Sequence, residues 1–101
     1  MKPADPAVEA LLLPFREGLL AWPGEGGVLF IGARAGAALQ GRQPGLVCVQ
    51  PSKPDAEALE RAGFTVALEA PEARYPLVLL LPSRQRDQAR AQFARALQRL
   101  A

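Results

Sequence analysis

Hydrophobic residues along this chain follow two kinds of spacing. Apolar positions recur every three or four residues, as on one side of a helix, within residues 6–19, 52–62 and 83–100. Short apolar or alternating runs separate these segments, at residues 28–31, 46–49, 64–68 and 77–81. Strands that alternate with helices predict an α/β fold, in which a parallel sheet is connected by right-handed crossovers.

The four runs differ in how strongly they predict burial. Val28–Ile31 and Leu46–Val49 are wholly apolar and are typical of buried strands. Residues 64–68 alternate apolar with polar or small side chains, which indicates a strand at or near a sheet edge. Residues 77–81, Leu-Val-Leu-Leu-Leu, form the most apolar run. We therefore expect them to be a central strand covered on both faces.

The first helix is expected to begin at Asp5 and Pro6, an N-cap residue followed by a proline at the first helical position. Its apolar positions continue to Leu19. Pro14 falls inside that pattern and predicts a kink or two short helices. A further short helix of small residues is expected after the first strand, ending near Gln40.

Two helices are expected in the second half of the chain. One begins at Ser52–Asp55 and ends at Gly63, a residue suited to a left-handed C-cap. The last begins near Ser83, and we expect its core-facing side to consist of Ala89, Phe93, Ala96, Leu97 and Leu100. The capping role explains both Ser52 and Ser83 better than a catalytic one does.

The length of 101 residues fits one domain spanning 1–101, with half of the residues hydrophobic. The single cysteine, Cys48, lies in an apolar run, where it is expected to be a small buried hydrophobe, and it fits a reducing cytoplasm. Arginine is far more frequent than lysine, and histidine is absent, as is asparagine. This bias favours a thermophilic source, although a GC-rich genome produces much of it as well.

The residue types present exclude several kinds of chemistry. Without histidine, and with Cys48 in an apolar run, the chain offers no nucleophile–base pair and no set of metal ligands. No apolar run approaches the ~20 residues that span a bilayer, and the N-terminus lacks the order of a secretory signal. We therefore expect a cytoplasmic protein that is not an enzyme and binds no metal.

Charge gathers near the end of the chain. The net charge of +2 does not by itself indicate nucleic-acid binding. Residues 83–101, however, carry five arginines against one acid, Asp87. Helical spacing places Arg84, Arg95 and Arg99 opposite the expected apolar side, so they are candidate contacts to RNA phosphates. The alternative is an ordinary solvated helix face in an arginine-rich protein.

The residues after the first strand resemble a cofactor loop that has lost its chemistry. The sequence from Phe30 to Gly36, Phe-Ile-Gly-Ala-Arg-Ala-Gly, is similar to the D-x-G-x-G-x-G loop of class I S-adenosylmethionine-dependent methyltransferases. Gly32 and Gly36 match the outer glycines. Phe30 stands where the family has its acid, and Arg34 replaces the middle glycine. A long side chain thus occupies the space in which cofactor and backbone meet.

Two later landmarks of that family are also changed. The acid that would bind the ribose after the second strand is Gln50, which lacks the charge and the bidentate acceptor geometry. The catalytic N-P-P-like tetrapeptide after the fourth strand corresponds to residues 80–83, in which Pro82 alone matches. The resemblance therefore implies a methyltransferase-like fold that binds no cofactor and has no catalytic residue.

A degenerate half of this kind is found in one group of this class. Residues 28–100 resemble the non-catalytic N-terminal domain of ribosomal RNA guanine-N2 methyltransferases of the small-subunit type, through residues 29–32 and 79–89. This implies a Rossmann-like three-layer sandwich with a mostly parallel four-stranded sheet in the order 3-2-1-4. The implied role is to assist or pack on an RNA methyltransferase, with ribosomal RNA, a catalytic domain or a second copy as partners.

Two other functions stay open at this point. The chain could be a small protein that binds S-adenosylmethionine or a nucleotide through the loop from Gly32 to Gly36. It could equally be a homo-oligomeric module without a ligand.

Overall fold

The computed structural model describes residues 6–35 and 45–101. In this part of the chain the elements are three helices and four strands, in the order α1 (Pro6–Arg16), β1 (Val28–Ile31), β2 (Leu46–Val49), α2 (Lys53–Arg61), β3 (Thr65–Ala67), β4 (Leu77–Leu80) and α3 (Arg86–Arg99). The expected helix near Gln40 lies outside the described residues, as do Asp5 and Gly36.

The strands form one sheet in the order β3-β2-β1-β4, and every pairing is parallel. Val28 of β1 pairs with Leu46 of β2 on one side and with Leu77 of β4 on the other. The predicted fold class and strand order are confirmed. The expectation that residues 77–81 form a central strand is wrong, because β4 is an edge strand of this sheet.

The apolar run in β4 has another cause. Its alternate side chains enter different cores: Leu79 is buried on one face, whereas Val78 and Leu80 pack against the cluster on the other. A continuous apolar run therefore indicates that both faces of a strand are covered by other parts of the protein. It does not indicate whether the strand has a neighbouring strand on each side within the sheet. The wholly buried strand is β1, with four buried residues.

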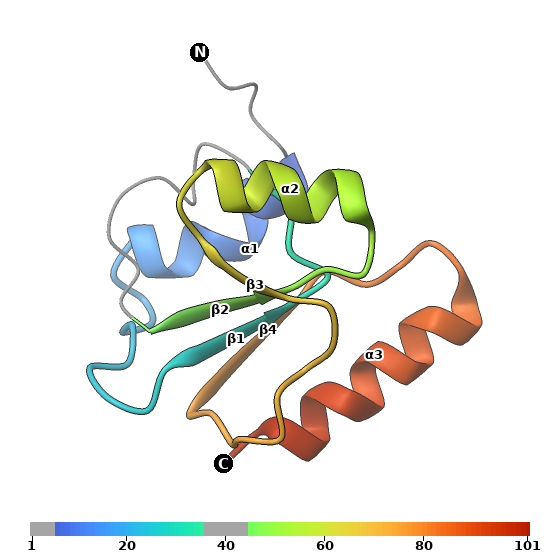
Figure 1. Cartoon of the computed structure of the whole chain (residues 1–101). Helices are drawn as coiled ribbons and strands as arrows, with labels where there is room; N and C mark the ends of the chain where they lie inside the picture. Colours follow the sequence, from blue (N-terminus) through green and yellow to red (C-terminus); the bar gives the residue numbers. More distant parts are fainter. Residues whose placement is uncertain (1–5, 36–44) are drawn as a thin grey trace.

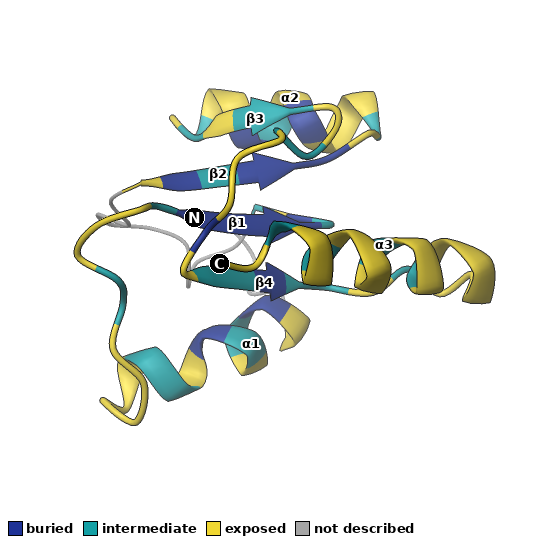
Figure 2. Ribbon diagram, turned by 90° about the horizontal axis from the view of Figure 1, so that it is seen from below, coloured by how far each residue is buried: buried dark blue, intermediate teal, exposed yellow. Residues whose placement is uncertain are grey.

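Helices cover both faces of the sheet, which makes three layers (Figure 1). α1 and α2 lie on one face and α3 on the other. The larger core, on the side of α1 and α2, contains Val8, Phe30, Leu59 and Leu79. The smaller core contains Leu29, Ile31, Val49 and Tyr75, against which Ala96 of α3 packs. In Figure 2 the buried residues concentrate in the strands, while α3 is exposed along most of its length.

The first helix ends earlier than its apolar pattern predicts. α1 is one continuous helix that contains Pro14 and ends at Arg16. Gly18 follows with a φ of 75°, a left-handed conformation that stops the helix. Leu19 consequently lies beyond the helix and is 77% exposed. α2 matches its prediction more closely, with Ser52 at the N-cap and a left-handed Gly63 after its end.

The expected core-facing side of α3 is wrong. The helix begins at Arg86 rather than near Ser83. Phe93 and Leu97 are each 58% exposed, and Leu100 is exposed as well. The half-buried positions are instead Ala89, Gln92, Ala96 and Arg99. Small alanine side chains let the helix lie close to the sheet, so the large apolar residues turn outward.

The connection from β3 to β4 contains no helix, so part of the sheet on the α3 side is covered by α3 and a loop alone. The end of the chain is tied to this loop. The amide of Tyr75 donates to the Arg99 carbonyl at 2.7 Å, and the amide of Ala101 donates to the Tyr75 carbonyl at 2.8 Å. No helix among the described residues has the length and apolar character needed to cross a membrane.

Candidate functional site

The carboxyl ends of the parallel strands meet at one edge of the sheet. Gly32 follows β1, Gln50 follows β2 and Leu81 follows β4. The chain runs from β1 to β2 and β3 on one side and reaches β4 on the other. In open α/β sheets, ligands bind outside the carboxyl ends at such a reversal of strand order. This edge is therefore the candidate functional site.

Gln50 fastens two loops of this edge together. Its side chain is buried, and its Nε2 donates to the carbonyl oxygen of Ala33 at 2.7 Å. Its Oε1 accepts a hydrogen bond from the amide of Ser52 at 3.0 Å. A carboxylate could accept the second bond but could not donate the first. At the position where the family has its ribose-binding acid, this chain thus has a side chain whose donor and acceptor both serve the protein.

Gly32 is required by the protein backbone itself. Its φ of 75° is left-handed, and a Cβ placed there would collide with the carbonyl oxygen of Leu81. It would also lie 3.2 Å from Nε2 of Gln92. The glycine therefore allows the end of β1 to approach the end of β4 and the helix α3. This explains Gly32 without any cofactor.

Phe30 and Arg34, two further residues compared above with the methyltransferase loop, lie in different surroundings. Phe30, where the family has an acid, is fully buried in the larger core and pairs with Cys48 and Leu79 in the neighbouring strands. Arg34 is exposed and lines a cleft at the strand ends. Gly36 lies outside the described residues, so its match to the family loop stays a prediction.

The segment after β4 is held by a glutamine network. The amide of Ser83 donates to Oε1 of Gln92 at 2.8 Å, and its hydroxyl donates to Oε1 of Gln88 at 2.9 Å. The same hydroxyl accepts a hydrogen bond from the amide of Gln85. Ser83 thus orders the entry to α3, but the N-cap residue is Gln85. The two glutamines were missed by sequence reasoning because nothing in their spacing marks them.

A first cleft, which we call the strand-end cleft, opens at the ends of β1, β2 and β4 with a volume of about 810 Å³. Its lining comes from loops, from the start of α1 and from the first half of α3: Ala7, Gly32, Arg34, Gln50, Pro51, Ser52, Leu81, Pro82, Ser83, Arg84, Gln88 and Gln92. Among the described residues that line it, the charged ones are Arg34 and Arg84.

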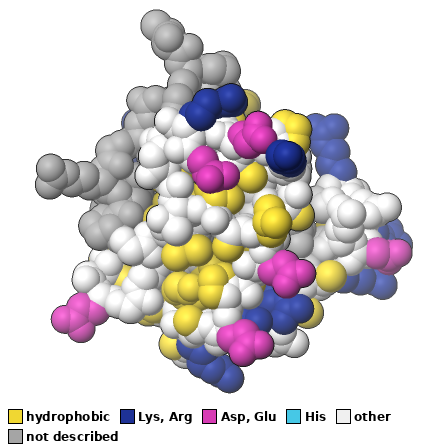
Figure 3. Space-filling view, in the orientation of Figure 1, with side chains coloured by type: hydrophobic (Ala, Val, Ile, Leu, Met, Phe, Trp, Pro, Cys, Tyr) yellow, Lys and Arg dark blue, Asp and Glu magenta, His cyan; other side chains and the backbone are white. Residues whose placement is uncertain are grey.

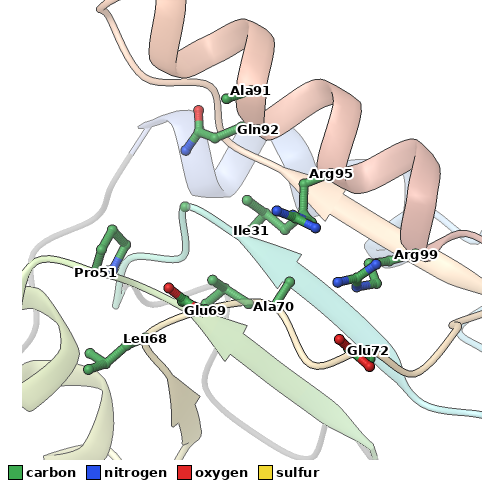
Figure 4. A pocket seen from close by; sticks show the side chains of 12 residues that line it. Ile31, Pro51, Leu68, Glu69, Ala70, Glu72, Ala91, Gln92, Arg95 and Arg99 are labelled. Carbon is green, nitrogen blue, oxygen red and sulfur yellow. The ribbon is translucent and has the colours of Figure 1, made fainter.

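A second cleft, of about 490 Å³, lies between α3 and the loop that leads from β3 to β4. In Figure 4, Arg95 extends from α3 towards Ile31 and Arg99 lies farther along the helix, with Glu69 and Glu72 across the cleft from them. Arg99 is anchored, because its Nε donates to the carbonyl of Pro71 at 2.6 Å. Among the described residues that line this cleft, two acids and two arginines balance each other in charge.

The three candidate arginines do not share one helix face. Arg84 precedes α3 and lines the strand-end cleft, whereas Arg95 and Arg99 line the second cleft. The two clefts share Gly32, Pro51 and Gln92 as a common wall. Arg99, however, ends α3 beside Tyr75, which precedes β4, and so it lies towards the opposite end of the sheet from Arg84. On the side of the molecule seen in Figure 3, charges of both signs surround exposed hydrophobic side chains. The charge on this side is thus mixed.

Other candidate chemistry finds no support in the geometry. Cys48 is fully buried in β2, and burial raises the pKa of its thiol to about 11, which disfavours the reactive thiolate. Ser52 stands at the N-cap of α2, although its hydroxyl makes no capping hydrogen bond. Among the described residues, no group of three or more His, Cys, Asp or Glu side chains could hold a metal ion.

Comparisons of the chain with protein-family models, with curated proteins and with solved structures find no significant match. The α/β fold with its parallel sheet in the order β3-β2-β1-β4 is thus what the structure establishes, and function has to be argued from the site.

Proposed function

We propose that this chain is a non-catalytic, methyltransferase-like domain that assists or packs on a ribosomal RNA methyltransferase. The observation that carries the proposal is the side chain of Gln50, whose amide bonds to Ala33 and Ser52 at the position where a cofactor-binding domain needs a free acid. This domain keeps the strand order of a methyltransferase but uses the position of the acid for hydrogen bonds of its own. We therefore infer that it supports the chemistry of another protein.

Three features argue against S-adenosylmethionine as a ligand. Phe30 is buried in the core and offers no polar group. Gly32 is explained by its contact with the Leu81 carbonyl. In the described part of the chain, the charged residues that line the strand-end cleft are Arg34 and Arg84, and neither offers a carboxylate that could balance the sulfonium of the cofactor.

The packing role is supported by surfaces without a partner. β4 pairs with β1 on one side and, among the described residues, with no strand on the other. Phe93 and Leu97 of α3 are each more than half exposed. Exposed apolar side chains of this size beside an open sheet edge are typical of surfaces that contact another protein.

The RNA contact in this proposal uses Arg84, Arg95 and Arg99, which follow the α3 side of the sheet from its carboxyl edge towards its amino end. Phosphate contacts contribute affinity that does not depend on base sequence and that falls with salt. Arg84 and Arg95 are exposed, whereas Arg99 is partly occupied by the Pro71 carbonyl. We therefore expect the first two to contribute more.

Two titrations test the proposal. Calorimetry with S-adenosylmethionine and its demethylated product should show no binding, and a dissociation constant of about 10 µM or tighter would contradict the non-catalytic role. Binding of a small-subunit ribosomal RNA fragment should weaken, with a lower salt slope, when Arg84, Arg95 and Arg99 are changed to glutamine together.

The control removes three arginines that line neither of the two clefts, by changing Arg61, Arg86 and Arg90 to glutamine. Its net charge equals that of the test variant. If both triple variants bind RNA equally, the RNA contact lies elsewhere or is unspecific, and only the packing role is left.

A further inference from the structure

We infer that the open edge of β4, together with the side of α3 beside it, binds an extended segment of a partner protein that carries acidic residues. This deepens the packing role proposed above and rests on it, because it names the mode of packing and the chemistry of the partner. We call this surface the β4 docking edge, and it consists of Val78, Leu80, Arg86, Arg90, Phe93 and Leu97.

The first support is the backbone along the outer side of β4. The amide of Leu81 donates to the carbonyl oxygen of Ile31 at 3.0 Å, so alternate residues of this strand bond to β1. The backbone groups of Val78 and Leu80 therefore point to the other side, where no strand of the described chain pairs with β4. A row of unpaired backbone groups at a sheet edge readily accepts a further strand.

β4 also lacks the features that protect most sheet edges. Its four residues include no charge and no proline. The opposite edge strand, β3, has only three residues, and its first, Thr65, is polar and exposed. Pro76 and Pro82 stand on either side of residues 77–81, and a proline has no amide hydrogen to donate. The open edge is therefore short, which suits a short segment of a partner better than unlimited association.

The side of α3 next to this edge is apolar. α3 packs on β4, and its Arg95 lines the second cleft, which lies beside the ends of β2 and β3. Helical periodicity places Phe93 and Leu97 on the other side of the helix from Arg95, and hence towards the open side of β4. Each is 58% exposed. The half-buried side chains of Val78 and Leu80 lie on the same face of the sheet, so strand and helix form one apolar strip.

The charge of this strip indicates the chemistry of the partner. The same periodicity places Arg86 and Arg90 on the side of Phe93 and Leu97. Both arginines are exposed, and within the described part of the chain neither forms an ion pair. A second copy related by two-fold symmetry would bring the same two arginines to the interface again. Charge complementarity therefore favours a partner segment with acidic residues over a second copy.

The experiment is a titration of the full chain, labelled with ¹⁵N, with a short capped peptide of alternating valine and threonine that begins with two glutamates. An antiparallel strand would place these glutamates at the carboxyl end of β4, near Arg86 at the start of α3. Amide hydrogen exchange at Val78 and Leu80 should slow by about tenfold at saturating peptide, because both amides gain an acceptor. Exchange at Leu79, whose amide faces β1, should change little.

A second peptide and three variants separate the backbone contact from the charge. The same peptide beginning with two lysines should bind about tenfold more weakly. Changing Arg86 and Arg90 to glutamine together should remove this preference without abolishing binding. Leu97→Ala should weaken binding of both peptides. The matched control is Leu68→Ala, since Leu68 is also exposed but follows β3 at the opposite edge of the sheet.

Three results would overturn the inference. The first is unchanged exchange at Val78 and Leu80 with the glutamate peptide at millimolar concentration. The second is equal affinity for the two peptides, which would contradict an acidic partner. The third is exchange at these amides that slows with protein concentration alone, because a second copy would then occupy the edge. None of these results involves the cofactor or RNA, so the titrations proposed above decide the non-catalytic role and the RNA contact separately.

Discussion

The side-chain amide of Gln50 donates a hydrogen bond to the carbonyl oxygen of Ala33, with 2.7 Å between Nε2 and the oxygen. Through this bond the loop after β2 holds the loop after β1. The contact is specific to an amide, because neither oxygen of a carboxylate could donate to a carbonyl. The effect of replacing Gln50 with an acid on the stability of the protein therefore measures this contact.

Changing Gln50 to glutamate should lower the free energy of unfolding by about 1–3 kcal/mol or more, because the Ala33 carbonyl loses its donor and a charge is buried. Urea denaturation at pH 7 measures this. Gln98→Glu is the control, since Gln98 is exposed and accepts a hydrogen bond from Arg95, which a carboxylate can also accept. Equal stability of the two variants would mean that the Gln50 contact contributes little.

Gly32→Ala should destabilise the protein by more than Gly18→Ala. Both glycines have a φ of 75°, so both variants bear the strain of a left-handed alanine, about 1–3 kcal/mol. Only at Gly32 does the new Cβ meet the Leu81 carbonyl, while at Gly18 nothing lies within 4 Å. The difference between their denaturation midpoints reports the close approach of β1 and β4, and it would vanish if the two strand ends were farther apart.

The orientation of α3 can be tested with two neighbouring alanines. Ala96→Glu should cost about 1–3 kcal/mol, because Ala96 packs against the smaller core and a carboxylate would be brought into contact with apolar side chains. Ala94→Glu, on the exposed side, should change stability by no more than about 0.5 kcal/mol. If Phe93 and Leu97 faced the core instead, Phe93→Ala would be the costly change, so that variant belongs in the same thermal denaturation series.

Alkaline pH should destabilise the protein through Cys48. Burial raises the pKa of the thiol from 9.0 to about 11, so the folded state holds this proton more tightly than the unfolded state does. The contribution is fully present below about pH 9 and is lost as the pH rises towards 11, at about 1.4 kcal/mol per unit of pKa. Cys48→Ala should show a flatter pH profile of unfolding in that range. Parallel profiles would contradict this role of the thiol.

Much of the fold was predictable from the sequence, because the burial of helices and strands requires hydrophobic residues at regular spacing. Val28–Ile31 and Leu46–Val49 are strands with the predicted bounds, and the edge strand around Val66 was recognised by its alternation. The position of residues 77–81 was not, because a strand at a sheet edge can be covered on both faces and then reads like a central one.

The site was predictable only in part. Gln50 and Arg34 were singled out through their departures from a family loop, and both lie at the carboxyl edge. The orientation of α3 could not be read from its sequence, since its large apolar residues face solvent and small ones face the sheet. Nor does any local pattern reveal that Gln92 bonds to Ser83, nine residues away in the chain.

The place of β1 in the sheet has a consequence for the order of folding. Both strands that pair with Val28 come later in the chain, at Leu46 and at Leu77. During synthesis β1 therefore leaves the ribosome with Phe30 exposed and with neither partner available. The pairing of β1 with β4 joins residues that are far apart in the sequence. This slows folding, because the chain between them loses conformational entropy before the contacts form. Until β4 has been made, the strand that is wholly buried in the folded protein is open to wrong pairing.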